Sequence, residues 1–509
     1  MSRSQAAHSL EDLNPSDIKP IDGSATVSFQ KPSPGFSITM RLQLENQPGN
    51  FSKVTALIAN EMASLAEVSM LSSDFKYVLR DITVLCMSES HAQQIVYLIQ
   101  KLSGIRLIEW HDDTFEMHRG GKLVVQATMP ITSRAQLARA YTPGVARVCT
   151  AIANNSSKAY DYTIKGNCVA VISDGTAVLG LGDIGPFAAM PVMEGKAMIF
   201  REFAGINAFP ICLNTKDPDR IIETVKMIAP GFGGINLEDI AAPGCFEIEE
   251  RLRAELDIPV FHDDQHGTAV VVLAGLLNAM KIVGKKLSEL KVVVNGFGAG
   301  GVACTRILLS AGVRNIIACD TAGIVYRGRT ERMNSIKESV VAQTNPDNIK
   351  GSVGDALRGA DVFIGVSGPR TIDRAMVQSM ARDAIVFALA NPIPEILPDE
   401  ISDLARITAT GRSDYANQVN NALCFPGIFR GALDCRARTI DDSMKVAAAQ
   451  AIAESISDTE LREDCIIPCL FDRSVPQRVA QRVQEAARRA GLARSDSGFA
   501  YCAESPNLS

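Results

Sequence analysis

The stretch from Leu290 to Asp320 constrains the fold more than any other part of the sequence. Its first five residues are apolar except for one lysine, which is typical of a buried parallel strand. Gly296, Gly298 and Gly301 follow this strand pattern, and an apolar helical pattern follows the glycines. A second strand pattern ends at Asp320, about twenty residues further on, so the spacing fits G-x-G-x-x-G in its full context. This order predicts a doubly wound, Rossmann-type α/β domain with a dinucleotide at its glycine loop.

The same glycines and the acid after the second strand indicate the kind of cofactor. The glycines let a pyrophosphate approach the helix N-terminus, and Asp320 can accept hydrogen bonds from ribose hydroxyls. A carboxylate here repels a 2′-phosphate, which favours NAD, but Arg327 and Arg329 are close enough in sequence to leave NADP open. Two later strand patterns lead to Ser367 and Asn391, at the carboxyl edge where such sheets line their ligand crevice. We therefore expect Ser367 and Asn391 in the cofactor site.

Two acidic pairs flank a helical pattern and a short strand ahead of this domain. Glu238-Asp239 precede them and Asp263-Asp264 follow, and elements of that length can bring the two pairs together. Close carboxylates repel by roughly 1 kcal/mol in water and by several times more in a partly dry cleft, so they need a cation, a shared proton or solvent. Their oxygens suit a hard ion, Mg²⁺ or Mn²⁺. A solvated loop or a helix cap is the commoner place for an acidic pair, and this interpretation of Glu238-Asp239 stays open.

Two residues further upstream are candidates for proton transfer. Tyr141 stands directly before a Thr-Pro-Gly turn, and a phenol can act as a general acid when its neighbours stabilise the phenolate. A half-buried packing role is the commoner use of a tyrosine. Lys196 enters an apolar helical pattern. It is either a surface residue whose stem covers apolar surface, or a desolvated amine whose pKa is lowered toward neutrality, and only the second can act as a base.

The N-terminal region has a pattern of its own. Residues 1–35 are rich in Ser, Pro and Asp and are predicted to be disordered. Residues 36–118 alternate strand and helix patterns in the order β-α-β-β-α-β, the arrangement of a ferredoxin-like unit. With the Gln47-Pro-Gly-Asn50 turn before its first helix, this unit resembles ACT regulatory domains. The resemblance implies a small effector, often an amino acid, while a purely structural or dimerising module stays equally open.

Composition excludes several classes of partner. A chain of 509 residues suggests about three domains, and 46% apolar residues are enough to fill their cores. The net charge is −6, and Lys and Arg are scattered among acids, which argues against nucleic acid. The N-terminus lacks the features of a signal or transit peptide, and the longest apolar run, 268–280, is too short for a membrane span. With dispersed cysteines as well, we expect a cytoplasmic protein with a small-molecule substrate and no membrane partner.

Five motifs together resemble the malic enzymes, specifically the shorter bacterial type. They occur in family order, at Ala140–Gly144, Gly180–Gly185, Glu194–Lys196, Leu237–Asp239 and His262–Asp264. The resemblance runs from about residue 120 to about residue 448. It implies Tyr141 as the general acid and Lys196 as the general base. It further implies metal ligands at Glu238, Asp239 and Asp264, a neighbouring catalytic-site carboxylate at Asp263, and substrate contacts at Asn391 and Asn421.

The resemblance also implies the reaction and the domain plan. L-malate would be oxidatively decarboxylated to pyruvate and CO₂ with reduction of NAD or NADP, in a homodimer or a higher homo-oligomer. The implied domains are a catalytic domain over 119–265, a Rossmann-type domain over 266–421, and C-terminal helices over 422–509 that pack on the catalytic domain. One departure concerns the substrate. Larger malic enzymes carry a carboxylate-binding arginine before Leu-Gly-Leu-Gly-Asp, where this chain has Thr176-Ala177.

Two other functions stay open on the same residues. A malolactic enzyme would use the same side chains, retain NAD and release lactate, so NADH absorbance during turnover separates it from a malic enzyme. A non-catalytic regulatory protein would combine the ACT-like unit with an inactive dehydrogenase body. The presence of the tyrosine, the lysine and the full carboxylate set argues against the second alternative.

Overall fold

The computed structural model describes residues 31–495, and the chain divides into two compact units, Met1–Lys122 and Leu123–Ser509. Most of the predicted disordered tail lies outside the described residues. The predicted end of the tail, residue 35, is too far along the chain, because strand β1 already begins at Ser33. The implied catalytic domain, Rossmann-type domain and C-terminal helices fall in the second unit, except for residues 119–122 at the start of the catalytic domain.

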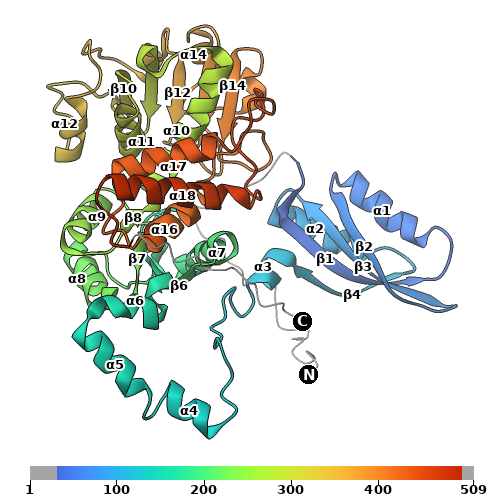
Figure 1. Ribbon diagram of the computed structural model, residues 1–509. Helices are drawn as coiled ribbons and strands as arrows, with labels where there is room; N and C mark the ends of the chain where they lie inside the picture. The colour runs from blue at the N-terminus through green and yellow to red at the C-terminus, as the bar shows by residue number, and fades with distance from the viewer. Residues whose placement is uncertain (1–30, 496–509) are drawn as a thin grey trace. The chain divides into compact units, whose positions relative to one another are not determined.

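The first unit has the predicted β-α-β-β-α-β order (Figure 1). Its elements are β1 (Ser33–Glu45), α1 (Asn50–Asn60), β2 (Ser64–Ser73), β3 (Tyr77–Cys86), α2 (Glu89–Ile99) and β4 (Ile105–Asp112), followed by α3 (Asp113–His118). The sheet order is β2-β3-β1-β4, with antiparallel pairs. Alternate residues of β1, such as Ile38 and Met40, are fully buried in one core with residues of both helices, Val54 and Ile95 among them. The ferredoxin-like arrangement is confirmed, and the ACT resemblance stays a prediction.

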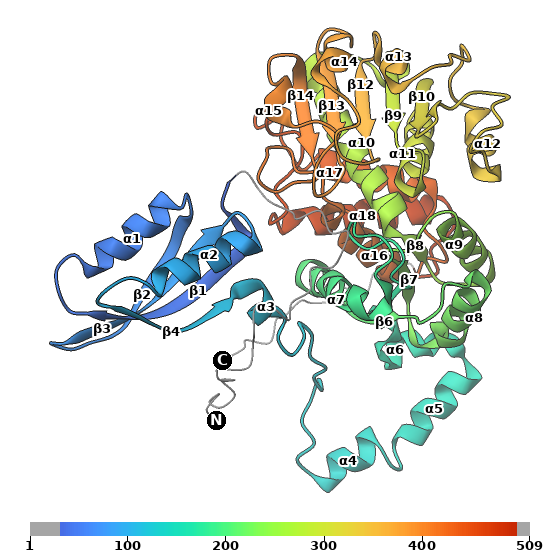
Figure 2. The same ribbon diagram turned by 180° about the vertical axis from the view of Figure 1, so that it is seen from behind.

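The second unit begins with an arm that buries almost nothing. Residues 123–133 lead to α4 (Arg134–Ala140) and α5 (Val145–Asn154), and neither of these two described helices has a buried residue. Both helices stand apart from the rest of the second unit in Figures 1 and 2. The arm nevertheless carries exposed apolar side chains, including Val124 (87% exposed), Val125 (85%) and Met129 (63%). We call residues 123–154 the arm below.

A four-stranded parallel sheet follows α6 (Ala159–Tyr162), in the order β6-β5-β7-β8. Its strands are β5 (Cys168–Ser173), β6 (Asn207–Cys212), β7 (Gly234–Leu237) and β8 (Val260–His262), joined by α7 (Gly185–Ala204), α8 (Pro218–Ile228) and α9 (Gly244–Glu255). Every residue of strands β5 and β7 is buried, as expected for a parallel sheet covered on both faces. Because β7 and β8 are parallel neighbours, the residues after them meet at one edge.

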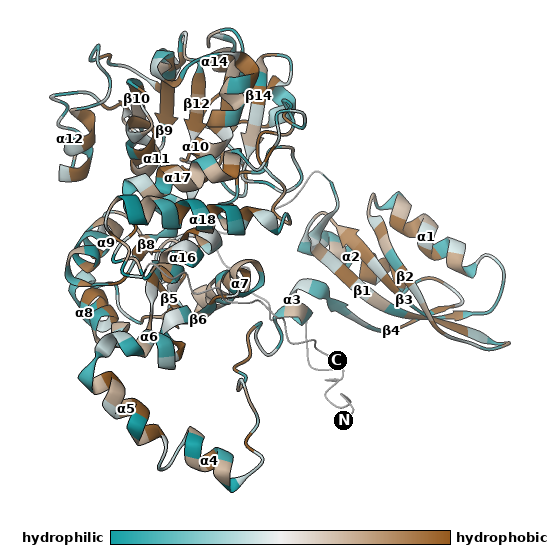
Figure 3. Ribbon diagram, in the orientation of Figure 1, coloured by the Kyte–Doolittle hydropathy of each residue, from teal (hydrophilic) through white to brown (hydrophobic). Residues whose placement is uncertain are grey.

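The second sheet has six strands in the order β11-β10-β9-β12-β13-β14 and is parallel except for β11. Its strands are β9 (Lys291–Asn295), β10 (Asn315–Asp320), β11 (Gly323–Ile324), β12 (Val362–Gly365), β13 (Ala384–Ala388) and β14 (Ala405–Thr410). The helices among these strands are α11 (Ala299–Ser310), α12 (Ser335–Val341), α13 (Val353–Leu357), α14 (Arg374–Gln378) and α15 (Pro398–Ile401). Figure 3 shows hydrophobic residues along β9 and β12. The predicted Rossmann-type fold is confirmed.

Helix α10 (Asp263–Val283) joins the two sheets, and the C-terminal helices pack on it. It is long and apolar enough to cross a membrane, but 72% of its apolar window is buried inside the protein. Helices α16 (Phe425–Asp434), α17 (Asp442–Ala453) and α18 (Ser474–Arg489) share its core. The ring of Phe200 on α7 lies 4.7 Å from that of Phe425, edge to face. Helix α16 therefore packs on α7, one of the helices that join the strands of the four-stranded sheet.

Candidate active site

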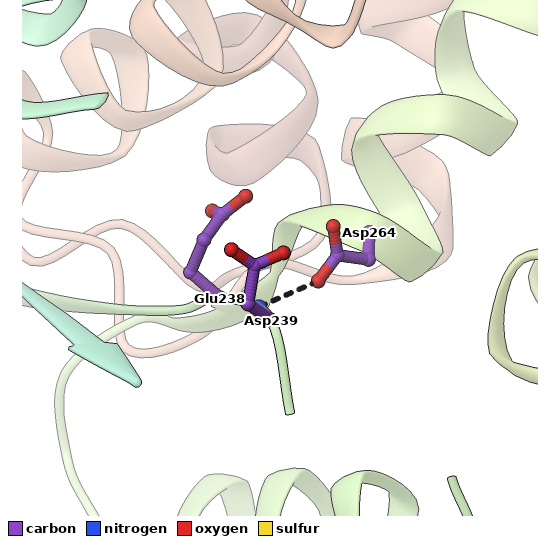
Figure 4. A group of neighbouring side chains, drawn as sticks. All are labelled: Glu238, Asp239 and Asp264. Atoms are coloured by element: carbon purple, nitrogen blue, oxygen red, sulfur yellow. Dashed lines mark hydrogen bonds between the residues drawn. The ribbon is translucent and has the colours of Figure 1, made fainter. Parts of the chain in front are cut away.

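The two acidic pairs come together, as predicted from their spacing. Glu238 and Asp239 follow β7, and Asp264 lies in the first turn of α10. One carboxylate oxygen from each of the three lies within 4.8 Å of those of the other two (Figure 4). The Asp239 backbone N–H donates to Asp264 Oδ2 at 2.8 Å. Glu238 and Asp239 are both buried, so the solvated-loop interpretation is wrong for this pair.

The electrostatics of this cluster call for a cation. Burial, followed for Asp239 by the charges of Asp264 and Glu238, raises the pKa of Asp239 to about 8. Burial likewise raises the pKa of Glu238 to about 7 and that of Asp264 to about 6. Asp239 Oδ2 is buried and has no hydrogen-bond partner among the described residues, and its backbone adopts a left-handed φ of 54°. Three convergent hard oxygen donors, one of them unpartnered, fit Mg²⁺ or Mn²⁺.

Lys196 points into this cluster from α7. Its Nζ lies 2.9 Å from Glu238 Oε1, 2.5 Å from Asp263 Oδ2, and 4.3 Å from the centre of the Phe425 ring. Burial alone lowers the pKa of Lys196, but the charges of Asp263 and Glu238 outweigh burial and raise it above its ordinary value. The sequence-based condition for a base, an amine with a lowered pKa, is therefore not met in this state. Lys196 is an ammonium ion because its two anionic neighbours stabilise the charge.

Asp263 is the other partner of this ammonium group. Its side chain is fully buried, accepts from Lys196, and also accepts a short hydrogen bond from Asn421 Nδ2. Burial, only partly offset by Lys196, raises the pKa of Asp263 to about 7. A Cβ at Gly267 would lie 2.0 Å from Asp263 Oδ1, so the carboxylate requires glycine one turn along the helix. Asn421 was predicted to contact substrate, and in the structure it holds Asp263.

Tyr141 does not join the cluster within one chain. It follows α4 in the arm, and its side chain is 69% exposed, whereas Lys196 is 7% exposed. Helix α4 stands well apart from α7, β7 and β8 in both views (Figures 1 and 2). Neither the exposed Tyr141 nor its distance from Lys196 could be read from sequence spacing. The half-buried packing role is also wrong for this tyrosine.

The glycine loop has the predicted form. Gly296 has a φ of 106°, and a Cβ there would lie 2.5 Å from Val366 O. A Cβ at Gly301 would lie 1.9 Å from Gly296 O, so both positions exclude any larger residue. Gly298 precedes α11, and no atom lies within 4 Å of where its Cβ would be. The loop therefore leaves open space at the start of α11, where a pyrophosphate would bind.

The acid at the end of β10 is paired with two cations. Both oxygens of Asp320 accept from the Arg329 guanidinium, at 2.7 and 2.6 Å, and Lys337 Nζ donates to Oδ2 at 2.6 Å. Burial alone raises the pKa of Asp320, but these partners lower it overall. Arg327 instead donates to Pro346 O. Of the two arginines considered from the sequence, Arg329 is the one beside Asp320, and sequence reasoning missed Lys337.

Ser367 and Asn391 lie at the carboxyl edge of the six-stranded sheet, after β12 and β13 as predicted. Ser367 donates through its N–H and its hydroxyl to Glu395 Oε1, at 2.9 and 3.2 Å. A Cβ at Gly180 would lie 2.8 Å from Asn391 O, so the Gly-Leu-Gly-Asp loop packs on Asn391. Sequence reasoning missed Glu395, and also Asn236, whose Nδ2 donates to Glu238 Oε2 at 2.8 Å.

Comparison with known protein families shows which family the chain belongs to. The malic enzyme N-terminal domain matches residues 120–253, and the malic enzyme NAD binding domain matches residues 265–488. The chain belongs to the malic enzyme family. Lys196, Glu238 and Asp239 lie in the first matched domain, and Asp264 lies between the two domains. The glycine loop lies in the second matched domain. The family assignment predicted from five short motifs is confirmed.

Known malic enzymes resemble the chain over most of its length. An NAD-dependent malic enzyme of Geobacillus stearothermophilus is 58% identical over 461 residues, which cover 91% of this chain and 96% of that protein. The bifunctional malic/malolactic enzyme of Bacillus subtilis is 54% identical over 75% of this chain and 94% of its own length. A crystal structure of the malic enzyme from Pyrococcus horikoshii has a TM-score of 0.73 at 51% identity, covering 76% of this chain and 92% of that one. The match to the Geobacillus stearothermophilus enzyme is longer than the second unit, so it extends into the first unit.

Proposed function

We propose that this malic enzyme oxidatively decarboxylates L-malate to pyruvate and CO₂ with reduction of NAD, in the cytoplasm. The observation that carries the proposal is the set of three converging buried carboxylates beside Lys196, close to the NAD binding domain. Glu238, Asp239 and Asp264 would hold Mg²⁺ or Mn²⁺. When bound, the ion supplies Lewis-acid polarisation of the C2 oxygen and of the enolate that decarboxylation leaves.

Lys196 and Asp263 act as one proton-transfer unit in this proposal. An ammonium ion cannot accept a proton, so Lys196 must release one as it takes the proton of the C2 hydroxyl. Of the two carboxylates that contact Lys196, Asp263 is the nearer, at 2.5 Å, and it is the one that the proposal does not assign to the metal. A pKa raised to about 7 suits a group that gains and loses a proton near neutrality. Asn421 donates to Asp263 and so fixes the direction of its carboxylate.

The position of Tyr141 leads to a proposal for the assembly. The arm exposes Val124, Val125 and Met129, while the catalytic body exposes Leu179 (62%), Leu181 (62%) and Phe187 (91%) in the loop before α7 and in its first turn. Apolar surface on this scale marks an interface, and a homodimer is the commonest assembly. We propose that the arm of one copy packs on a second copy and brings Tyr141 to that copy's Lys196. Tyr141 would then protonate C3 of the enolate across the dimer.

The reaction is tested by following both products during turnover with malate, NAD and Mn²⁺. The proposal predicts NADH and pyruvate in equal amounts and no NADH after removal of the metal. Lactate without net NADH would instead establish the malolactic reaction, which is relevant because the Bacillus subtilis relative is named bifunctional. Malate consumption independent of metal would contradict the proposal.

The pairing around Asp320 predicts use of both dinucleotides. The Asp320 carboxylate accepts from Arg329, Lys337 and the Ala322 N–H, so a ribose hydroxyl of NAD would replace one of these donors. Arg329 and Lys337 bring two positive charges to the same place. For Lys337→Gln we expect kcat/KM with NADP to fall about tenfold, the loss typical of one charge-assisted hydrogen bond, with NAD changing less than about threefold. Steady-state rates with each dinucleotide measure this. Lys350→Gln, which removes a lysine near the Tyr326 ring, is the matched control. Equal losses with both dinucleotides would contradict the assignment.

A further inference from the structure

Glu395 is a buried acid that the reaction does not use. It lies in the loop between β13 and α15 and is 0% exposed. Its Oε1 accepts from the Ser367 N–H and hydroxyl, and its Oε2 accepts from the Ala390 N–H at 3.0 Å. No Lys or Arg forms an ion pair with it among residues 31–495. A buried carboxylate without a cation costs free energy unless several donors satisfy it, so its place in the fold calls for a reason.

The donors of Glu395 connect three neighbouring strands. Ser367 follows β12 and Ala390 follows β13, so the carboxylate ties the ends of two parallel strands. Asn295, the last residue of β9, donates from Nδ2 to Ser367 Oγ at 3.1 Å and thus adds the third strand. Packing here is tight, because a Cβ at Gly365 would lie 2.4 Å from Glu395 Cδ. One side chain therefore sets the spacing of the strand ends at the carboxyl edge.

We propose that Glu395 is a positioning residue for the dinucleotide: by holding the loops after β12 and β13 together, it shapes the crevice that the cofactor enters. The proposal rests on the proposed function, in which the dinucleotide lies at this edge of the sheet. It also changes the role of Ser367. The Ser367 hydroxyl donates its proton to Glu395 and accepts from Asn295, so it has no proton left to donate to the cofactor.

Asp361 offers a matched control at the amino ends of the same parallel strands. It directly precedes β12, its Oδ2 accepts from the backbone N–H of Lys291 in β9 at 2.8 Å, and its Oδ1 accepts from Lys285 Nζ at 2.7 Å. It too ties β9 to β12, but at the amino ends, away from the crevice. Loss of Asp361 should therefore affect stability without affecting the cofactor.

The test compares NADH affinity, measured by fluorescence titration of the full-length protein, with thermal stability. Glutamine has one accepting oxygen where Glu395 has two, so Glu395→Gln cannot keep the hydrogen bonds to both Ser367 and Ala390. We expect the NADH dissociation constant to rise about tenfold, as for loss of a charge-assisted hydrogen bond. The KM for NAD should rise likewise, with kcat at saturating NAD within about threefold of the parent. Asp361→Asn should lower Tm but leave NADH affinity within about twofold.

Glu395→Asp provides a second variant, since it keeps the charge but shortens the reach and should weaken NADH binding to a smaller degree. The proposal is overturned if Glu395→Gln binds NADH like the parent, or if Asp361→Asn weakens NADH binding as much as Glu395→Gln does. If Glu395→Gln does not fold, unchanged NADH affinity in Glu395→Asp overturns it. A parent protein that binds no NADH would instead refute the proposed function.

Discussion

Replacing Lys196 by alanine is expected to lower kcat by about 10²–10⁴, the usual loss for a group that transfers a proton in the rate-determining step. The side chain lies between Glu238 and Asp263 at 2.9 and 2.5 Å, where no other Lys or Arg of the described chain pairs with either acid. Removing it eliminates the proton carrier and leaves two buried carboxylates without their cation. Initial rates with malate, NAD and Mn²⁺ give the loss, and circular dichroism shows whether the fold persists.

Lys196→Arg separates proton transfer from simple charge. Arginine keeps the positive charge but does not release a proton at accessible pH. If Lys196 carries a proton, the arginine variant should be about as inactive as the alanine variant, although it retains the cation. Turnover close to that of the parent in Lys196→Arg would show that Lys196 acts only as a fixed charge, and would remove the proposed relay to Asp263.

Mixing two inactive variants is expected to restore activity. If Tyr141 acts on the Lys196 of a second copy, a heterodimer of Tyr141→Phe and Lys196→Ala has one site with both residues intact and one with neither. When equal amounts are unfolded and refolded together, half of the dimers are mixed and about a quarter of all sites are complete, so activity should return to about a quarter of the parent level. Each variant refolded alone is the control.

Mixing restores no activity if Tyr141 and Lys196 act within one chain. If Tyr141 and Lys196 of the same chain form the site, each variant damages all sites of its own chain, and mixing gives no activity above the sum of the separate variants. Gel filtration of the parent protein must also show a dimer or a larger species. A monomer with full activity would contradict the exchange of arms.

Several features of the site were predictable because they depend on strand order. Once β7 and β8 are parallel neighbours, the acids that follow them must meet, and Glu238, Asp239 and Asp264 do so. The glycine loop was predictable for a similar reason, since Gly296 and Gly301 sit where no Cβ fits. In both cases local sequence and regular topology determine the geometry.

Features that depend on partners distant in sequence were not predictable. The pKa of Lys196 is raised and not lowered, because the negative charge of Asp263, 67 residues away in the sequence, lies beside the buried ammonium group and stabilises it. Asn421 donates to Asp263, which lies 158 residues away in the sequence. In the sequence, Glu395 is one acid in a proline-rich segment, and nothing there indicates its hydrogen-bond partners. The exposed position of Tyr141 reflects an arm whose helices, α4 and α5, contain no buried residue. Burial and charge at these positions follow from tertiary structure alone.

A manganese titration followed by electron paramagnetic resonance tests the central claim most directly, because it observes the ion and not the reaction. Since the pKa values of Asp239, Glu238 and Asp264 are raised to about 8, 7 and 6, the ion must displace protons, and its affinity should fall as the pH is lowered from 8 to 6. We predict one tightly bound Mn²⁺ per chain at pH 8, weaker binding at pH 6, and loss of that site in Asp239→Asn. Unchanged Mn²⁺ binding in Asp239→Asn, or no bound Mn²⁺ in the parent, would contradict the account.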